Sequence, residues 1–276
     1  MLRSSFKRFV KEKIYYKYLN LKGSFQYFGE KVVFPKGSLA FEYMMKNGVY
    51  EWDNLRFILG NIIEGSTYFD IGANVGLMSI PILSQFKKVK VVSIEASTIT
   101  FGYLESNWRA NRNSHRWLLI NKAISNTSGK EIDFYLAKSK NNLYNSMKDT
   151  SRVDFASVTK ITTTTIDEIW CGLNSPFVSF IKSDIEGADL LALKGGKTCI
   201  MNCRPIILLE WNMVNIVPFG FTNVDLLSMC EEIDYSCYAL PAINRIISEL
   251  ELSQNALTTE SFLLLPKSRG KYVTTS

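Results

Sequence analysis

One segment combines a carboxylate with a glycine turn in an order that suits ligand binding. It is Asp70–Gly76 (D-I-G-A-N-V-G), between a short apolar run and a helical pattern. Gly72 and Gly76 permit a tight turn and close approach of backbone to ligand. The dinucleotide fingerprint is different, G-x-G-x-x-G, and its helix N-terminus holds a pyrophosphate. A carboxylate at Asp70 repels phosphate and attracts a cation. The pattern therefore favours S-adenosylmethionine (SAM), which carries an ammonium and a sulfonium group, over a nicotinamide cofactor.

A second carboxylate, Glu95, ends the next apolar run, 19 residues after Gly76. An acid at this strand tip can accept two hydrogen bonds from ribose hydroxyls, each contributing about 1.5–3 kcal/mol. Taken singly, such a carboxylate can equally cap a helix or lie in a solvated loop. The two acids around one glycine turn favour the cofactor site. The predicted cofactor-binding residues are Asp70, Gly72, Asn74, Gly76, Glu95 and Ala123, the last bordering the adenine.

A third cluster of charged residues, Lys182–Asp189, lies at the end of a buried apolar run, and Glu210 ends the next such run. A neutral hydroxyl is a poor nucleophile, and a positioned base typically accelerates its reaction about 10²–10⁴-fold. The predicted catalytic residues are Lys182, Asp184, Glu186 and Glu210. Lys182 can act as the base only if burial lowers its pKa. Asp184 and Glu186 could instead cap the following helix and pair with its dipole.

We predict no bound metal. Glu210 could share a divalent cation with Asp184, but oxygen-ligand sites need several such groups. Cys199 and Cys203 lack a second pair at ligand spacing, and His115 is the only histidine, so a zinc site is not expected. Five scattered cysteines fit buried thiols in a reducing compartment.

These side chains need a frame that brings strand ends together. Apolar runs alternate with helical patterns, which indicates crossover connections and a doubly wound, mostly parallel α/β sheet. The nearly unbroken apolar runs fit strands covered on both faces, and such sheets bind ligands at the carboxyl ends of their strands. The predicted strands are 67–71, 89–94, 118–124, 132–136, 177–182, 205–209, 236–240 and 261–265. The predicted helices are 53–63, 77–86, 98–111, 188–200 and 224–233.

The net charge of +6 lies at one end of the chain. Residues 1–22 hold seven bases and one acid, 7 − 1 = +6, so residues 23–276 are neutral. A neutral body lacks the basic stripe of a nucleic-acid surface, so no nucleic-acid partner is expected. Residues 2–21 follow helical spacing and form either a membrane-surface or partner-binding helix or an arm packed on the domain.

We divide the 276 residues into a basic helical N-terminal extension, 1–49, and a catalytic domain, 50–276. No run of 18 apolar residues and no secretory signal occurs. A cytoplasmic protein is therefore expected, with possible peripheral contact between residues 1–22 and the inner face of the membrane. The sequence gives no prediction of oligomeric state.

Together these motifs resemble the FkbM-type methyltransferases of the class I SAM-dependent superfamily, over about residues 50–212. The matching positions are Asp70–Gly76, Glu95, Leu104, Asn107, Asn111, Gly129, Thr165–Asp167, Lys182–Asp189 and Arg204, Pro205 and Glu210. The resemblance implies a seven-stranded Rossmann-like sheet with the last strand, 261–265, antiparallel. It also implies SAM as cofactor and O-methylation of sugars or other biosynthetic intermediates. Ala96-Ser97 replaces a proline often found after the ribose-binding acid, which alters the local loop.

The expected acceptor is a hydroxyl of a glycan or small molecule. The loop 138–151 and the aromatic residues Trp211, Phe219 and Phe221 are candidates for its pocket, with surface loop and core packing as the other interpretation. A SAM-binding module without catalysis and an N- or carboxyl-methyltransferase remain alternatives. A carboxyl acceptor needs no base, so neutral substitutions at Glu186 or Lys182 would then cost little.

Overall fold

The computed structural model describes residues 18–19, 21–138 and 144–267. The predicted N-terminal helix, and with it the membrane contact through residues 1–22, falls almost wholly outside these ranges and stays a prediction. Among the described helices, none alone has the length and apolar character of a membrane span. Two neighbouring helical segments, Met213–Phe219 and Asn223–Glu232, reach this length and apolar character only when taken together, and the chain bends by 79° between them.

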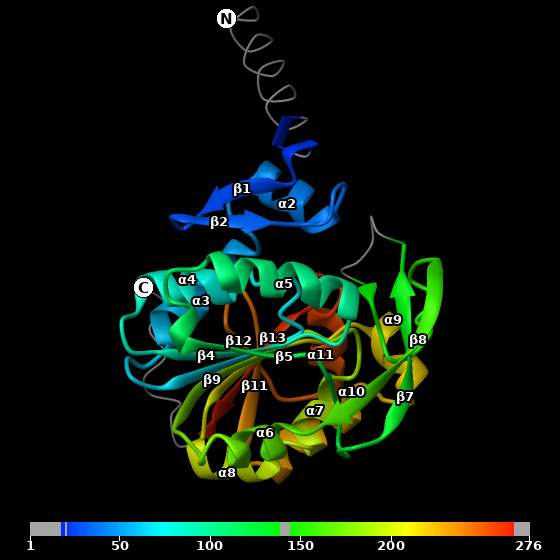
Figure 1. Cartoon of the computed structure of the whole chain (residues 1–276). Helices are drawn as coiled ribbons and strands as arrows, with labels where there is room; N and C mark the ends of the chain where they lie inside the picture. Colours follow the sequence, from blue (N-terminus) through cyan, green and yellow to red (C-terminus); the bar gives the residue numbers. More distant parts are fainter. Residues whose placement is uncertain (1–17, 20, 139–143, 268–276) are drawn as a thin grey trace, which may run out of the picture.

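The centre of the molecule is one eight-stranded sheet, in the order β12-β11-β13-β10-β9-β3-β4-β5 (Figure 1). The neighbours from β10 to β5 pair in parallel, whereas β13 is antiparallel to both β10 and β11. The predicted doubly wound sheet with an antiparallel last strand is thus confirmed, and β12 adds an eighth strand at one edge. The strands are β3 (Thr67–Ile71), β4 (Lys90–Ile94), β5 (Trp117–Ile120), β9 (Val178–Ser183), β10 (Ile206–Glu210), β11 (Tyr235–Ala239), β12 (Asn244–Ile246) and β13 (Ser261–Pro266).

Helices cover both faces of this sheet because successive strand residues point to opposite sides. Tyr68 and Phe180 pack into one apolar core, and their neighbours Phe69 and Ile181 into the other. The first core is covered by α3 (Trp52–Asn61), α4 (Ser79–Gln85) and α5 (Thr98–Ala110). The second is covered by α6 (Ile166–Gly172), α7 (Asp189–Lys194), α8 (Lys197–Cys203), α10 (Asn223–Glu232) and α11 (Glu249–Asn255). Short α9 (Met213–Ile216) and the 3-10 turns Ser114–Arg116 and Val217–Phe219 are further helical elements.

Two predicted elements are divided in the structure. The strand 118–124 ends at Ile120, because Asn121 donates its side-chain amide to the backbone carbonyls of Glu95 and Ala96 and turns the chain. Its remainder, β6 (Ala123–Ile124), joins a separate sheet, β6-β8-β7, with β7 (Glu131–Ala137) and β8 (Phe155–Thr164). The sequence prediction included β7 but missed most of β8.

The predicted helix 188–200 is α7 and α8, separated by Gly195-Gly196. Glycine is a poor helix residue, and a Cβ on Gly195 would lie 2.2 Å from the carbonyl oxygen of Ser125. The second helix starts again with its own cap, because the Asp167 carboxylate accepts hydrogen bonds from the backbone N–H groups of Thr198 and Cys199. This side-chain cap could not be inferred from helical periodicity.

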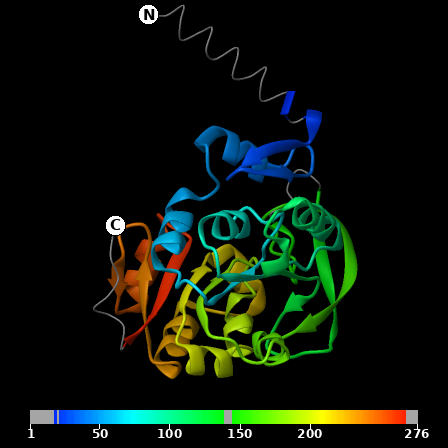
Figure 2. The ribbon, with the colours of Figure 1, turned by 60° about the vertical axis from the view of Figure 1, so that its left-hand side comes forward.

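The described part of the N-terminal extension is a hairpin, β1 (Ser24–Tyr27) and β2 (Glu30–Val33), followed by α2 (Leu39–Asn47). Figures 1 and 2 show both lying outside the sheet, beyond α4 and α5. Asn107 of α5 exchanges two hydrogen bonds with the backbone of Val33 and donates a third to the carbonyl of Val75. One buried amide therefore joins the extension to the glycine turn after β3.

Candidate functional site

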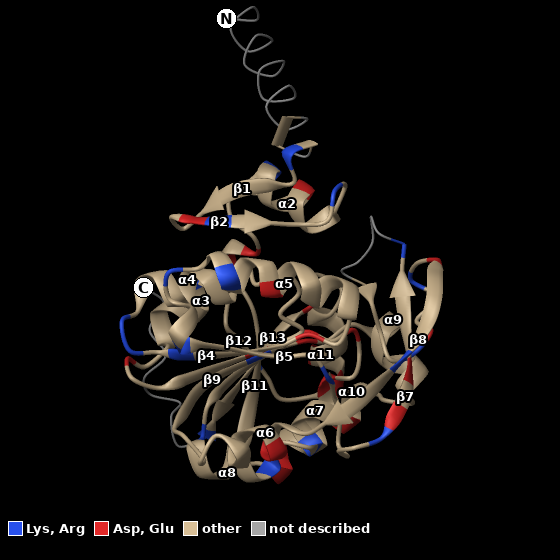
Figure 3. Ribbon diagram, in the orientation of Figure 1, with Lys and Arg blue, Asp and Glu red and all other residues tan. Residues whose placement is uncertain are grey.

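A cavity opens at the carboxyl ends of β3, β4 and β9. Figure 3 shows acidic residues gathered close to the ends of these central strands. Seven of the residues predicted from sequence line the cavity: Gly72, Asn74, Glu95, Ala123, Lys182, Asp184 and Glu186. Three predicted residues, Asp70, Gly76 and Glu210, lie next to it without forming its wall.

The glycine turn packs directly on the segment that follows β9. Gly72 has φ 75°, and a Cβ there would lie 1.9 Å from the carbonyl oxygen of Asp184. The backbone N–H of Asp184 donates to the carbonyl of Ile71, which fixes the two segments together. Only glycine allows this approach, so Gly72 sets the distance between the turn and the carboxylates beyond it.

Replacing Gly72 with alanine is expected to destabilise the protein. A left-handed conformation costs a non-glycine residue about 1–2 kcal/mol, and overpacking adds about 1–3 kcal/mol. Urea unfolding of Gly72→Ala should show a loss of roughly 2–5 kcal/mol. The matched control is Gly102→Ala in α5, where a Cβ meets nothing within 4 Å and helix propensity predicts a gain of about 1 kcal/mol. Equal stability of the two variants would contradict this packing.

Glu95 is buried at the end of β4, with its carboxylate held on both oxygens. One oxygen accepts the backbone N–H of Asn74 at 3.0 Å, and the other accepts the N–H of Ser97 at 2.8 Å. Burial raises the pKa of Glu95 to about 7, although these two hydrogen bonds lower it. The fixed carboxylate retains lone pairs that can accept hydroxyl donors from the cavity.

The affinity for S-adenosylhomocysteine (SAH) should depend on the ionisation of Glu95. The Glu95 carboxylate, which we predict to accept ribose hydroxyls, is fully ionised only above its pKa of about 7. Affinity should therefore be constant above about pH 8 and fall as the pH drops through 7, by up to roughly tenfold per unit. Calorimetric titrations from pH 5.5 to 8.5 measure this. The Glu95→Gln variant should lose the dependence, and an unchanged profile in that variant would rule out Glu95 as its source.

Asp70 lies beneath the glycine turn rather than on the cavity wall. It is fully buried, accepts the Ser79 hydroxyl at 2.5 Å, and has one oxygen 3.9 Å from the Lys182 ammonium. Ser79 also bonds Ser93, whose hydroxyl accepts the indole N–H of Trp117. Lys182 therefore places a positive charge beside Asp70. The contact between Asp70 and a cationic group of the cofactor, expected from the sequence, stays a prediction.

Lys182 is held as a cation. Burial lowers the pKa of Lys182, but the carboxylates of Asp184, Asp70 and Glu51 together outweigh burial and raise it. The ammonium lies 3.1 Å from Asp184 and is 5% exposed. From the sequence, Lys182 was predicted as a base only if burial lowered its pKa. The opposite net shift makes it a hydrogen-bond donor that holds Asp184.

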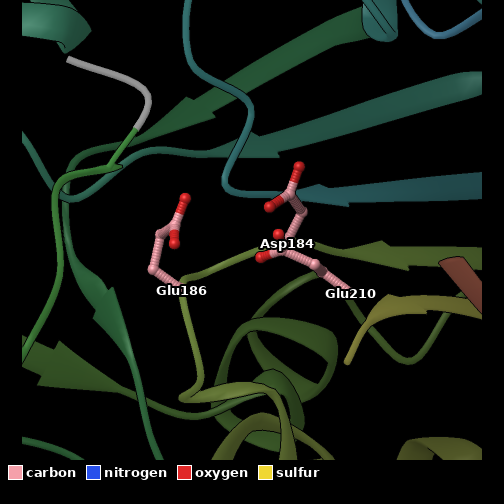
Figure 4. A group of neighbouring side chains, drawn as sticks. All are labelled: Asp184, Glu186 and Glu210. Atoms are coloured by element: carbon pink, nitrogen blue, oxygen red, sulfur yellow. The ribbon is translucent and has the colours of Figure 1, made fainter. Parts of the chain in front are cut away.

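Asp184, Glu186 and Glu210 meet at the ends of β9 and β10, each with a carboxylate oxygen within 4.8 Å of the others (Figure 4). Arg152 lies 3.3 Å from Glu186 and 3.6 Å from Glu210. The amide of Asn215 donates to Glu186 at 2.7 Å. Burial and Asp184 raise the pKa of Glu186 to about 8, which Arg152 partly opposes. Burial, Glu186 and Asp184 also raise the pKa of Glu210.

This cluster has the spacing to take up a proton or a cation. Its oxygens are close enough for a divalent ion, which in calcium sites is bound at about 2.3–2.6 Å. The guanidinium of Arg152 already supplies positive charge to two of the three carboxylates. The arrangement therefore fits proton transfer from a bound acceptor without requiring an ion.

The family model of the FkbM methyltransferase domain matches residues 70–237. The chain belongs to the FkbM methyltransferase family. A solved FkbM methyltransferase from Methylobacillus flagellatus KT is 17% identical, with a TM-score of 0.50 over 82% of this chain and 52% of that chain. The chain thus spans about half the length of that protein. A TehB-like SAM-dependent methyltransferase from Corynebacterium glutamicum is 12% identical, with a TM-score of 0.41 over 82% of this chain and 91% of that chain. No protein of curated function matches the sequence.

The aromatic residues expected at the acceptor pocket do not line the cavity. Trp211 is fully buried and donates its indole N–H to Asn223. Phe219 and Phe221 stack on each other outside the cavity and are half-buried. From the loop predicted to contribute, Asn145 and Met147 do line the cavity. Trp211 therefore takes part in core packing, which was the second interpretation.

Several residues at the site were missed by the sequence analysis. Tyr50 lines the cavity, Arg152 and Asn215 contact the carboxylate cluster, and Glu260 accepts a hydrogen bond from Arg152. All four lie in connections or short helices whose place depends on the whole fold. Glu51, beside Tyr50, has φ 41°, a conformation that is rare outside glycine and often marks functional sites, but no sequence motif announces it.

Proposed function

We propose that this FkbM methyltransferase transfers a methyl group from SAM to a hydroxyl of a glycan or another polyhydroxylated small molecule. The observation that carries the proposal is the cluster of Asp184, Glu186 and Glu210 beside the cavity that Glu95 and Gly72 shape. A hydroxyl acceptor requires a base, and carboxylates are placed there to provide one.

The cavity fits SAM on the chemistry of its walls. Glu95 presents a fixed, buried carboxylate that could accept ribose hydroxyls, and Gly72 lines the cavity because its missing Cβ allows the turn to pack closely on Asp184. Asp184 and Glu186 place two acidic groups beside a ligand with two cationic groups. Bound SAM would supply an electrophilic methyl group on its sulfonium, and Ala123 and Ile124, which line the cavity, would border the adenine.

Asp184 is the residue best placed as base. Asp184 would take up the acceptor O–H proton, which would leave the oxygen free to accept the methyl group that bound SAM would supply, with SAH as the leaving group. Lys182, 3.1 Å away, holds the carboxylate in place. Arg152 and Asn215 hold Glu186 and Glu210 behind it. Positioning of this kind can supply about 7–11 kcal/mol of the barrier reduction.

The alternative acceptors, a carboxylate and an amine, differ in their charge. A carboxylate acceptor would lie beside three acidic side chains, Asp184, Glu186 and Glu210, and would be repelled by each one that is ionised, which disfavours a carboxyl-methyltransferase. A protonated amine would be attracted by the same cluster and would also need a base. An amine acceptor is therefore the second candidate supported by this site.

The test is a product screen with CD3-labelled SAM. Neutral pyranosides, amino sugars, aliphatic amines and carboxylic acids are incubated with the full chain and analysed by mass spectrometry. Label on a sugar oxygen supports the proposal, and label on nitrogen alone moves the enzyme to the second candidate. SAH binding with no labelled product from any class would favour a binding module without catalysis.

A further inference from the structure

A second, smaller cavity of about 350 Å³ lies beside the one that Glu95 lines. It sits over the carboxyl ends of β9 and β10 and the start of β13, next to the first turn of α3. Lys182 and Asp184 line both cavities. A ligand in the second cavity therefore touches the same carboxylate as a ligand in the first.

We propose that this second cavity is the acceptor subsite, and that it selects polyhydroxylated acceptors without negative charge. This inference rests on the proposed methyl transfer, and it adds the place and the charge of the acceptor. Residues not yet assigned a role form much of its wall: Glu51, Asn54, Glu260 and Ser261.

The wall consists mainly of hydrogen-bond acceptors. Four carboxylates, of Glu51, Asp184, Glu210 and Glu260, face one ammonium, that of Lys182. Ionised carboxylates accept hydrogen bonds, and protonated carboxyl groups both donate and accept them, so hydroxyl groups such as those of a sugar match the wall in either state. A phosphate or carboxylate on the acceptor would instead be repelled by each carboxylate of the wall that is ionised.

The polar wall is built from segments that are held together across the fold. Asn54 of α3 donates from its amide both to Glu51 and to the hydroxyl of Ser261, each at 3.0 Å. Arg152 donates to Glu260 at 3.3 Å and lies 3.6 Å from Glu210. These contacts position the carboxylates before any ligand arrives, which reduces the entropy lost on binding.

The geometry of Glu51 indicates a functional role for its side chain. It precedes α3 with φ 41° and makes no side-chain capping bond to the helix. Its carboxylate turns to Asn54 and the second cavity instead. Burial, and next the charge of Asp184, raise the pKa of Glu51, as expected where negative charge is incompletely balanced. Glu51 therefore has a strained left-handed backbone and does not stabilise α3 through its side chain. Such strain is found at functional sites, which indicates that the position of this carboxylate is the selected feature.

Matched neutral and acidic sugars test the inference without requiring turnover. The probes are the methyl pyranosides of glucose, galactose, mannose and rhamnose, with methyl glucuronide and methyl galacturonide as acidic partners. Saturation-transfer NMR and competition titrations use the full chain with saturating SAH. At least one neutral pyranoside should bind, and its uronide partner should bind at least tenfold more weakly.

Variants place the binding in the cavity. Glu51→Gln and Glu260→Gln should each weaken the neutral sugar at least fivefold and narrow its preference over the uronide, with SAH affinity unchanged. Glu105→Gln, an exposed carboxylate on α5, is the charge-matched control and should change nothing.

Three results would overturn the inference: no neutral pyranoside binding while SAH binds normally, a uronide binding as well as its neutral partner, or sugar binding indifferent to Glu51 and Glu260. Loss of SAH binding in the wild type would instead defeat the proposed methyl transfer itself. The two failures are therefore separate in the data.

Discussion

Replacing Glu95 with alanine is expected to reduce SAH affinity by about 10²–10⁴-fold. The variant would remove the two hydrogen bonds that we propose Glu95 accepts from ribose hydroxyls, each contributing about 1.5–3 kcal/mol. It also frees the backbone N–H groups of Asn74 and Ser97, which the carboxylate holds at the rim of the cavity. Calorimetric titration with SAH at pH 8 gives the measurement.

The control for this variant is Glu105→Ala, which removes an exposed carboxylate from α5 and should leave SAH affinity within a factor of two. Circular dichroism and a thermal melt of Glu95→Ala separate lost binding from lost structure. Retained micromolar affinity in a folded Glu95→Ala protein would remove Glu95 from the cofactor site.

Asp184→Asn is expected to lower the rate of methyl transfer by about 10²–10⁴-fold, the usual contribution of a general base. Asparagine keeps the size of the side chain but cannot take up the acceptor proton at neutral pH. SAH affinity should change far less than the rate. Single-turnover rates with an acceptor from the product screen measure the effect.

Glu186→Gln and Glu210→Gln are the companions of this variant, because their carboxylates lie in the same cluster. We expect smaller losses from both, since neither lines both cavities. A full rate with Asp184→Asn together with a rate lost in Glu186→Gln would transfer the role of base to Glu186.

The fold could be predicted from sequence because its information is local and periodic. Apolar runs of four to six residues, each followed by a turn motif, specify buried parallel strands wherever they occur. The same locality placed Glu95, Asp184 and Glu186 at strand ends, since Glu95 and Asp184 directly follow their strands and Glu186 lies two residues after Asp184. Gly72 was predicted for its turn, but its contact with Asp184 depends on the pairing of two strands more than 100 residues apart.

Charge balance could not be predicted, because it depends on groups that meet only in the folded chain. The direction of the pKa shift of Lys182 follows from three carboxylates on three different segments, at positions 51, 70 and 184. Arg152 reaches Glu260, which is 108 residues away in sequence. No spacing rule connects such positions, so the acidic second cavity became evident only in three dimensions.

The adjacent positions of Tyr50 and Glu51 link the walls of the two cavities. Tyr50 lines the larger cavity and Glu51 the smaller. Because one peptide bond joins them, a displacement of the backbone between α2 and α3 would change both walls at once. A substitution in this segment that alters binding in one cavity is therefore expected to alter binding in the other.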